Sequence, residues 1–439
     1  MKLASPAATE ARGASRRERR QSFALNVFNG ALFEFAERLV DPPLVLTWFV
    51  SNLSNSNLLI GLVAPMGEAG WFLPQIFVSV PLQRMERKMP SYRVAAVIRS
   101  LTWIMLAAGV WLIDDPRTLL VGFFLLYGLA RVMSGLAGLS YFDITAKTVP
   151  AHRRGLLFSL RLFLGGILGL GAGLVVSAVL DHPRLSFPRD HAVLFGLYCV
   201  ATVPALAAFS AIREPPGRAM AERFSLGSQL RQARTILRED LVYRRYIAAR
   251  LVQVLAGIAL PFYVVYAKNE LQASAAMLGV YVSTRVVTQL ALNLPWGWVS
   301  DRRGNRLVMK LLMLGNGTTA LLALGVVLLA GLVQRGGTWL PFLVLPLFAL
   351  DGASRPAQTL VGSNFLLELS PEEERSLYLG LSNTLTGLTL LVSGLGGLLV
   401  DALGYGGLFG VAVALCVIGY ALVVKLPEPR DEGYTTTVV

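Results

Sequence analysis

The chain of 439 residues is 54% hydrophobic and only 15% charged, whereas about 25% of the residues in an ordinary soluble domain are charged. Apolar stretches recur along most of the chain, and they reach the roughly 20 residues that a helix needs to cross a bilayer. These values exclude a water-soluble enzyme and leave no room for a separate catalytic domain. The formal net charge of +13 would suggest nucleic-acid binding in a soluble protein, but its distribution along the chain gives another explanation.

Hydropathy predicts an all-α integral membrane protein with twelve transmembrane helices. One long polar stretch at 213–245, with a run at 225–239 suited to a surface helix, divides them into two groups of six. The expected organisation is therefore a basic tail (1–21), a six-helix half (22–212), a linker (213–245), a second six-helix half (246–424) and a second tail (425–439). The predicted helices are 22–51, 57–81, 94–113, 118–146, 155–180, 191–212, 246–267, 274–300, 308–332, 339–367, 376–400 and 404–424.

Lys and Arg lie mainly in every second segment between these helices, with six before the first helix and eight in 213–245. The positive-inside rule then predicts that both termini and the linker are cytoplasmic. The net charge is thus mostly an orientation signal, and no nucleic-acid partner is expected. Residues 1–21 contain no apolar core with a cleavage site, so the first helix should remain as a membrane span.

The two halves look like an internal repeat. Pro43 and Gly61 in the first half reappear as Pro261 and Gly279 in the second, both after 218 residues. Duplicated six-helix halves are typical of secondary transporters, whose substrate site lies between the repeats near the middle of the bilayer.

A sequence motif lies at the cytoplasmic end of the eighth predicted helix, with Gly297, Asp301, Arg302, Gly304 and Arg306 at fixed spacing. Gly297 permits close helix contact, Asp301 can cap a helix or pair with an arginine, and Gly304 allows a tight turn. The motif resembles the loop signature of the major facilitator superfamily. The resemblance implies a gate at this loop and a central cavity lined by the first, fourth, seventh and tenth helices.

The rest of the chain matches that family unevenly. The equivalent first-half loop, 81–88, has neither the aspartate nor the glycine, which predicts a weaker gate there. Arg131, followed by Gly135, resembles a motif of proton-coupled bacterial efflux-type permeases. The Gly-Pro dipeptide of many antiporters is absent from 155–180.

Charged side chains near the middle of membrane spans are costly and usually mark substrate or ion pathways. Helices 94–113, 191–212, 308–332 and 404–424 are predicted to have none near their centres, which fits an outer scaffold. The candidate proton-coupling and cavity residues are Glu34, Glu37, Arg38, Asp41, Glu68, Arg131, Arg285, Asp351 and Arg355.

Glu34, Arg38 and Asp41 are spaced to share one helix face, and Pro42 should kink the helix directly after them. The five acids of the candidate set outnumber its four bases, so one carboxyl should lack a counter-charge and be able to bind and release protons. Glu34 or Asp41 is the predicted group. The alternative is mutual neutralisation with no proton movement.

Asp351 and Arg355 are also four residues apart, which favours a structural pair between them. No metal site or nucleophile constellation is predicted, because the histidines lie in or beside loops and both cysteines lie in apolar stretches.

We therefore expect a monomeric secondary transporter, not an enzyme, that needs no cofactor. It would move a small organic solute by alternating access, coupled to protons or another ion, with export favoured, in a bacterial inner membrane. The alternative is a non-transporting assembly factor or receptor on the same scaffold.

Overall fold

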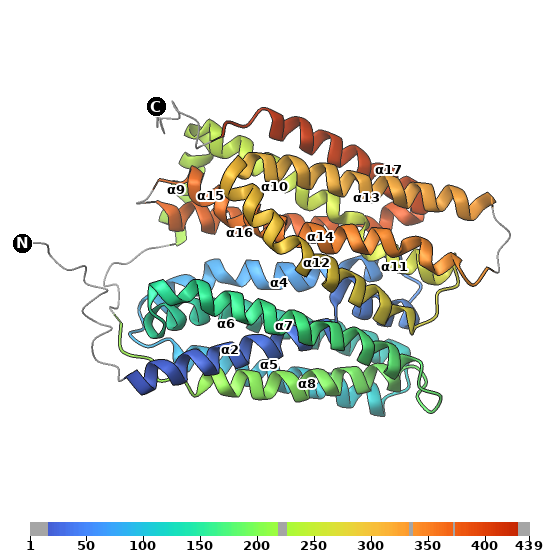
Figure 1. Ribbon diagram of the computed structural model, residues 1–439, viewed down its shortest axis with the longest axis horizontal. Helices are drawn as coiled ribbons and strands as arrows, with labels where there is room; N and C mark the ends of the chain where they lie inside the picture. Colours follow the sequence, from blue (N-terminus) through green and yellow to red (C-terminus); the bar gives the residue numbers. More distant parts are fainter. Residues whose placement is uncertain (1–15, 218–225, 333–336, 372–373, 429–439) are drawn as a thin grey trace, which may run out of the picture.

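The computed structural model describes residues 16–217, 226–332, 337–371 and 374–428. All regular elements in these ranges are helical (Figure 1), so the predicted all-α fold class is confirmed. The elements are α2 (Arg16–Leu39), η1 (Pro42–Leu46), α3 (Thr47–Leu53), α4 (Asn57–Gln83), α5 (Met89–Leu112), α6 (Pro116–Thr148), α7 (Ala151–Leu180), α8 (Arg189–Ser210), α9 (Leu226–Glu239), α10 (Leu241–Ala256), η2 (Gly257–Ala259), α11 (Leu260–Asn269), α12 (Met277–Arg303), α13 (Asn305–Leu332), η3 (Leu340–Val344), α14 (Leu345–Leu360), η4 (Val361–Phe365), α15 (Leu366–Leu369), α16 (Arg375–Ser393) and α17 (Gly396–Val424).

Seven helical segments of the described chain are long and apolar enough to cross a membrane: α5, α6, α7, α8, α10 with α11, α13 and α17. The other five predicted spans are also helical, but they are interrupted by irregular turns or carry more polar residues. The chain is thus a multi-pass membrane protein, and its helices are consistent with twelve crossings. Within the run 225–239, predicted as a surface helix, the described residues form the amphipathic helix α9 (Leu226–Glu239).

The predicted kink after Asp41 is present. Helix α2 ends at Leu39, Asp41 has a non-helical backbone, and the π-helical turn η1 starts at Pro42. Proline lacks the N–H that would continue the helix, and the Asp41 carbonyl accepts hydrogen bonds from the N–H groups of Leu44 (3.1 Å) and Val45 (2.8 Å) instead.

The helices form two bundles that lie side by side (Figure 1). Helices α2 to α8 make one bundle, and α10 to α17 make the other, with α9 packed against α10 and α16. Most of the predicted tails and part of the linker (1–15, 218–225 and 429–439) lie outside the described residues. The exact limits of the two halves remain a prediction.

The hydrophobic core differs between the two ends of the molecule. At the end opposite the chain termini, buried residues of both halves form one continuous cluster, which includes Phe49, Phe123 and Phe262. Near the termini each half has its own cluster, represented by Tyr92 in the first half and Tyr246 in the second. Within the described residues, the shared hydrophobic core therefore joins the halves at the end opposite the termini.

Small residues bring the halves together at the joined end. A Cβ atom on Gly397 would lie 2.0 Å from the Asn57 carbonyl oxygen, and one on Gly279 would lie 2.2 Å from the Gly173 carbonyl oxygen. Asn57 also donates a 2.6 Å hydrogen bond to the Asp401 carboxylate. Only glycine allows backbones to approach this closely.

Candidate functional site: a polar cavity between the halves

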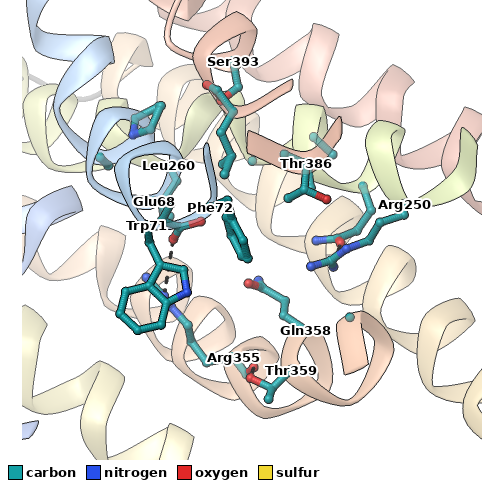
Figure 2. Close-up of a pocket in the computed structure, with 18 of the residues that line it drawn as sticks. Glu68, Trp71, Phe72, Arg250, Leu260, Arg355, Gln358, Thr359, Thr386 and Ser393 are labelled. Atoms are coloured by element: carbon teal, nitrogen blue, oxygen red, sulfur yellow. Dashed lines mark hydrogen bonds and ion pairs between the residues drawn. The ribbon is translucent and has the colours of Figure 1, made fainter. Parts of the chain in front are cut away.

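A cavity of about 570 Å³ lies between the halves and is lined mainly by α4, α10, α11, α14 and α16. Its wall reaches Leu379, near the start of α16 and so toward the chain termini, and Ser393 at the other end of that helix. Figure 2 shows Glu68, Trp71 and Phe72 facing Arg250, Gln358 and Thr386 around this space. Its size suits a small organic molecule.

Four of the nine candidate residues line this cavity, namely Glu68, Arg131, Asp351 and Arg355. Glu34 and Arg38 line a separate small cavity of about 30 Å³ between α2, α7 and α12. The remaining three, Glu37, Asp41 and Arg285, belong to ion-pair networks that connect with the wall of the larger cavity.

One network joins the two halves through Arg285. Its Nη1 lies 2.5 Å from Asp41 Oδ1 in the first half, and its Nε lies 2.7 Å from Asp351 Oδ2 on α14. The Arg285 side chain is only 2% exposed. Two carboxylates balance this buried arginine better than one would, because removing charge from water is costly unless it is paired and hydrogen-bonded.

The predicted pair between Asp351 and Arg355 is wrong. Asp351 binds Arg285, whereas Arg355 Nη1 lies 3.7 Å from Glu68 Oε1 of the other half (Figure 2). The spacing of four residues along α14 permits a pair within the helix. Asp351 and Arg355 each pair with a residue on a neighbouring helix instead. The attraction between Asp351 and Arg285 at 2.7 Å is strong because the surroundings have a low dielectric constant.

The stripe on the first helix is assembled as predicted, but it is extended to the other half. Arg38 lies 3.6 Å from the Glu34 carboxylate and 3.9 Å from the Asp41 carboxylate. Its Nη2 also donates a 2.9 Å hydrogen bond to the side-chain oxygen of Gln289 on α12.

Glu37 points away from that stripe toward α5, α6 and α8. Its carboxylate lies 2.9 Å from Arg99 Nη2 and 3.2 Å from Arg131 Nη1, and it accepts a hydrogen bond from the Tyr198 hydroxyl. Arg131 also donates to the Gly67 carbonyl, so this cluster holds α2, α4, α5, α6 and α8 together.

The structure corrects two predictions about charged residues. The third span starts at Met89 instead of 94, which places Arg99 near the centre of a helix predicted to have no central charge. Each of the five candidate acids has an arginine within 4.0 Å, and Glu37 has two, Arg99 and Arg131. The prediction of one unpaired carboxyl, assigned to Glu34 or Asp41, is therefore wrong.

Arg250 on α10 is a further cavity residue that the sequence analysis missed. It lies only four residues inside the predicted helix 246–267, so it resembled a residue at a helix end. In the structure α10 begins at Leu241, five residues before the predicted start. Arg250 therefore lies well inside the span, where it forms part of the cavity wall. Its Nη1 donates to the side-chain oxygen of Gln253.

The motif after α12 forms a tight turn beside α17. Gly304 has a positive φ of 80°, which favours glycine. Arg306 donates a 2.6 Å hydrogen bond to the Val424 carbonyl, and its backbone N–H donates to the Glu428 carboxylate. The Arg302 guanidinium lies 5.1 Å from the Trp298 ring centre. Among the described residues, no atom lies within 4 Å of where a Cβ on Gly297 would be, so the close helix contact expected at this glycine is not formed by this part of the chain.

Comparisons with known proteins agree with this architecture. Residues 245–437 match the family model described as Major Facilitator Superfamily. Uncharacterized proteins of Mycobacterium bovis and Mycobacterium tuberculosis are 26% identical over 322 residues, which cover 70% of this chain and 58% of theirs. The chain thus matches less than two thirds of the length of these curated relatives.

Similar solved structures include a D-xylose-proton symporter (TM-score 0.73, 17% identity, 94% of this chain and 99% of that chain). The nucleoside transporter NupG is also similar (TM-score 0.69, 13% identity, 93% and 99%). A peptide transporter POT in complex with sulfate gives a TM-score of 0.68 at 14% identity (97% and 99%). At these identities the likeness shows the fold, and it extends over nearly the whole chain.

Proposed function

We propose that this chain, which has the fold of the Major Facilitator Superfamily and matches that family's model over its C-terminal half, is a secondary transporter of a small organic solute. The observation that carries the proposal is the 570 Å³ cavity between the halves, with its charged and polar wall. A receptor or assembly factor on this scaffold would not need such a space, and bulky side chains could fill it.

Alternating access accounts for the different packing at the two ends of the molecule. The shared core and glycine contacts close the end opposite the termini, while the separate clusters leave the halves less tightly joined near the termini. With the predicted cytoplasmic termini, this is an inward-facing state. Rocking of the halves about the Asp41, Arg285 and Asp351 network would expose the cavity to the other side.

Proton coupling is part of the proposal, and Glu68 is the carboxyl that best fits the role. Its side chain is 50% exposed and lines the cavity, so protons can reach it. Its 3.7 Å ion pair with Arg355 joins α4 to α14 across the halves, so rocking changes the distance between the two charges. The facing of the transporter would thereby decide whether Arg355 stays beside Glu68 as its counter-charge.

Export is the proposed direction. It is supported by the acid-rich stripe of the first helix, ending in Asp41 and Pro42, which resembles that of multidrug exporters.

The first experiment identifies the solute and tests transport itself. Metabolite and drug-resistance profiles would be compared between a strain lacking the protein and the complemented strain, and the solute that changes would be assayed in proteoliposomes. Accumulation driven by a pH gradient is expected. A protein that binds no solute in its cavity and moves none under any gradient would contradict the transporter proposal and favour the receptor or assembly factor.

A second experiment tests the coupling residue. Glu68→Gln should abolish pH-driven accumulation but retain solute exchange, because the amide keeps the side-chain shape and cannot titrate. Glu34→Gln and Asp41→Asn test the two carboxyls chosen from sequence, and Glu86→Gln, at an exposed loop position, is the matched control. Wild-type accumulation and pH dependence in Glu68→Gln would show that Glu68 is not the coupling site.

A further inference from the structure

The charges around the cavity do not balance. Three arginines line it, Arg131, Arg250 and Arg355, together with the carboxylates of Glu68 and Asp351. Arg355 pairs with Glu68, and Asp351 is bound by Arg285. Of the five charged residues in the wall, Arg355, Glu68 and Asp351 therefore already have a partner of opposite charge.

The same holds for Arg131, which pairs with Glu37 outside the cavity at 3.2 Å. Arg250 differs, because no carboxylate of the described chain lies within 4.0 Å of its guanidinium. Its hydrogen-bond partner is the neutral Gln253 side chain. A cationic group without a counter-charge is expensive inside a membrane protein, and such groups usually serve a function.

The position of Arg250 is well defined by its surroundings. The Tyr246 hydroxyl, one helical turn earlier, donates a 3.0 Å hydrogen bond to the Val361 carbonyl in the π-helical turn η4. The Arg250 side chain passes next to Gly362 in that turn, where a Cβ would lie 2.9 Å from Nη2. Gln253 holds the other terminal nitrogen, so the guanidinium is oriented before any ligand arrives.

The rest of the wall suits an amphipathic molecule. Figure 2 shows Arg250 on one side of the opening and Trp71 on the other, with Phe72 and Gln358 between them in this view. The aromatic rings offer apolar surface, while Gln358, Thr359 and Thr386 offer hydrogen-bonding groups.

We propose that the transported solute is a small organic anion, and that Arg250 binds its negatively charged group. This inference rests on the proposed transport function of the cavity. The anion supplies the missing counter-charge, and a guanidinium binds an oxyanion through two parallel hydrogen bonds. Binding also lowers the cost of enclosing Arg250 when the halves close around the cavity, which couples occupancy to the conformational change.

The test uses two sets of matched probes with the purified full chain in detergent. The aromatic set is N-acetylphenylalanine (anionic), N-acetylphenylalaninamide (neutral) and phenylalaninamide (cationic). The sugar set is glucuronate, glucose and glucosamine. Binding is measured by the rise in the midpoint of thermal unfolding and by quenching of tryptophan fluorescence.

The anionic member of at least one set should bind more tightly than its neutral and cationic partners. Arg250→Gln should weaken that binding roughly 10- to 100-fold, because a hydrogen bond to a charged group is worth roughly 1.5–3 kcal/mol. Arg250→Lys should restore part of the affinity. Arg117→Gln, at an exposed position at the start of α6, is the control and should bind like the wild type.

Preference for a neutral or cationic probe, equal binding within both sets, absence of binding, or an unchanged affinity in Arg250→Gln would each overturn the inference. The proposed transport function would still hold after such a result if the solute found by metabolite profiling is neutral or cationic and accumulates in proteoliposomes. Conversely, a protein that binds the anionic probe through Arg250 but moves no solute would contradict transport alone.

Discussion

Glu37 lies at the centre of a buried cluster of charges in the N-terminal half. Two arginines and a tyrosine hydroxyl bind its carboxylate, and Arg99 is only 3% exposed. The Arg99 guanidinium also lies 4.5 Å from the centre of the Phe33 ring. Arg99 thus contributes both a counter-charge and packing, and its loss would leave a largely enclosed carboxylate with one cation fewer.

Arg99→Gln is therefore expected to destabilise the protein strongly. Removing one partner of a buried pair typically costs roughly 3–5 kcal/mol, and we expect about 3 because Arg131 remains beside Glu37. The measurement is the midpoint of thermal unfolding in detergent. Arg93→Gln removes an exposed arginine that binds the Ser210 carbonyl and should change the midpoint little. A similar midpoint for the two variants would argue against a structural role of the Glu37 cluster.

Two of the spans that line the cavity, the seventh and the tenth, are interrupted by irregular turns, and so is the first span. The first, seventh and tenth spans contain the turns η1, η2 and η4, respectively, and proline follows Asp41 in η1 and opens α11 at Pro261. Such breaks free backbone carbonyls, which membrane helices tolerate only where other groups satisfy them or where they line a cavity. The repeat noted in sequence at Pro43 and Pro261 thus marks equivalent breaks.

A glutamate binds the N-terminal end of a span at equivalent places in the two halves, namely the third span (α5) and the ninth span (α13). Glu214, after α8, accepts hydrogen bonds from the N–H groups of Lys88 (2.9 Å) and Met89 (2.6 Å) at the start of α5. Glu428, after α17, accepts one from Arg306 at the start of α13. A carboxylate at a helix N-terminus is favourable because it meets unsatisfied N–H groups and the positive end of the helix dipole.

The two loops near these caps differ, which leads to a prediction about the gate. In the first half, Lys88 and Lys147 both bind Asp143, at 2.6 and 2.7 Å, whereas the second half uses the motif around Gly304. Asp301→Ala is expected to slow turnover or shift the preferred facing without preventing membrane insertion. Gln83→Ala, at the C-terminal end of α4 in the first half, is the control and should have little effect. Equal transport rates in the two variants would contradict an asymmetric gate.

At the scale of the whole molecule, the contact between the halves is concentrated at one end. Lys268 of the second half donates hydrogen bonds to the Ser51 carbonyl (3.0 Å) and the Asn52 side chain (2.7 Å) of the first. Ser177 donates one to the Ala276 carbonyl (2.8 Å). The Ser177 contact lies beside the close backbone approach at Gly279, and all of these polar contacts must break for the molecule to open at this end.

Gly397→Ala should weaken the closed end, because the new Cβ would overlap the Asn57 backbone. A cysteine at Ser393, in the cavity wall, should then react severalfold faster with an impermeant maleimide added from the side opposite the termini. Cys199 and Cys416 would be replaced by serine in all variants. Gly410→Ala on the same helix, where a Cβ has open space, is the control. Equal labelling of the two variants would show that this contact does not keep the end closed.

The orientation of the protein can be tested independently. Reporter fusions at Glu222 and after Val439 should report the cytoplasm, and a fusion at Ser186, between α7 and α8, should report the outside. A cytoplasmic signal at Ser186 would reverse the orientation, and the closed end would then face the cytoplasm.

The amino-acid sequence by itself determined the helical architecture, the approximate position of each span and the kink after Asp41. These features depend on local properties, namely hydropathy over about 20 residues and the missing N–H of proline. It also identified four of the charged residues that line the cavity. The resemblance to the major facilitator superfamily rested on a local motif in the same way.

Only the tertiary structure decided which charges meet. Asp351 binds Arg285, 66 residues away, in preference to Arg355 on its own helix, and Glu37 binds Arg99, which sequence spacing did not connect with it. The energy of an ion pair depends on separations of a few ångströms. Those separations depend on how each helix is tilted and rotated against its neighbours, which hydropathy does not specify. The unbalanced charge of Arg250 became visible for the same reason, once every neighbouring carboxylate had been assigned its partner.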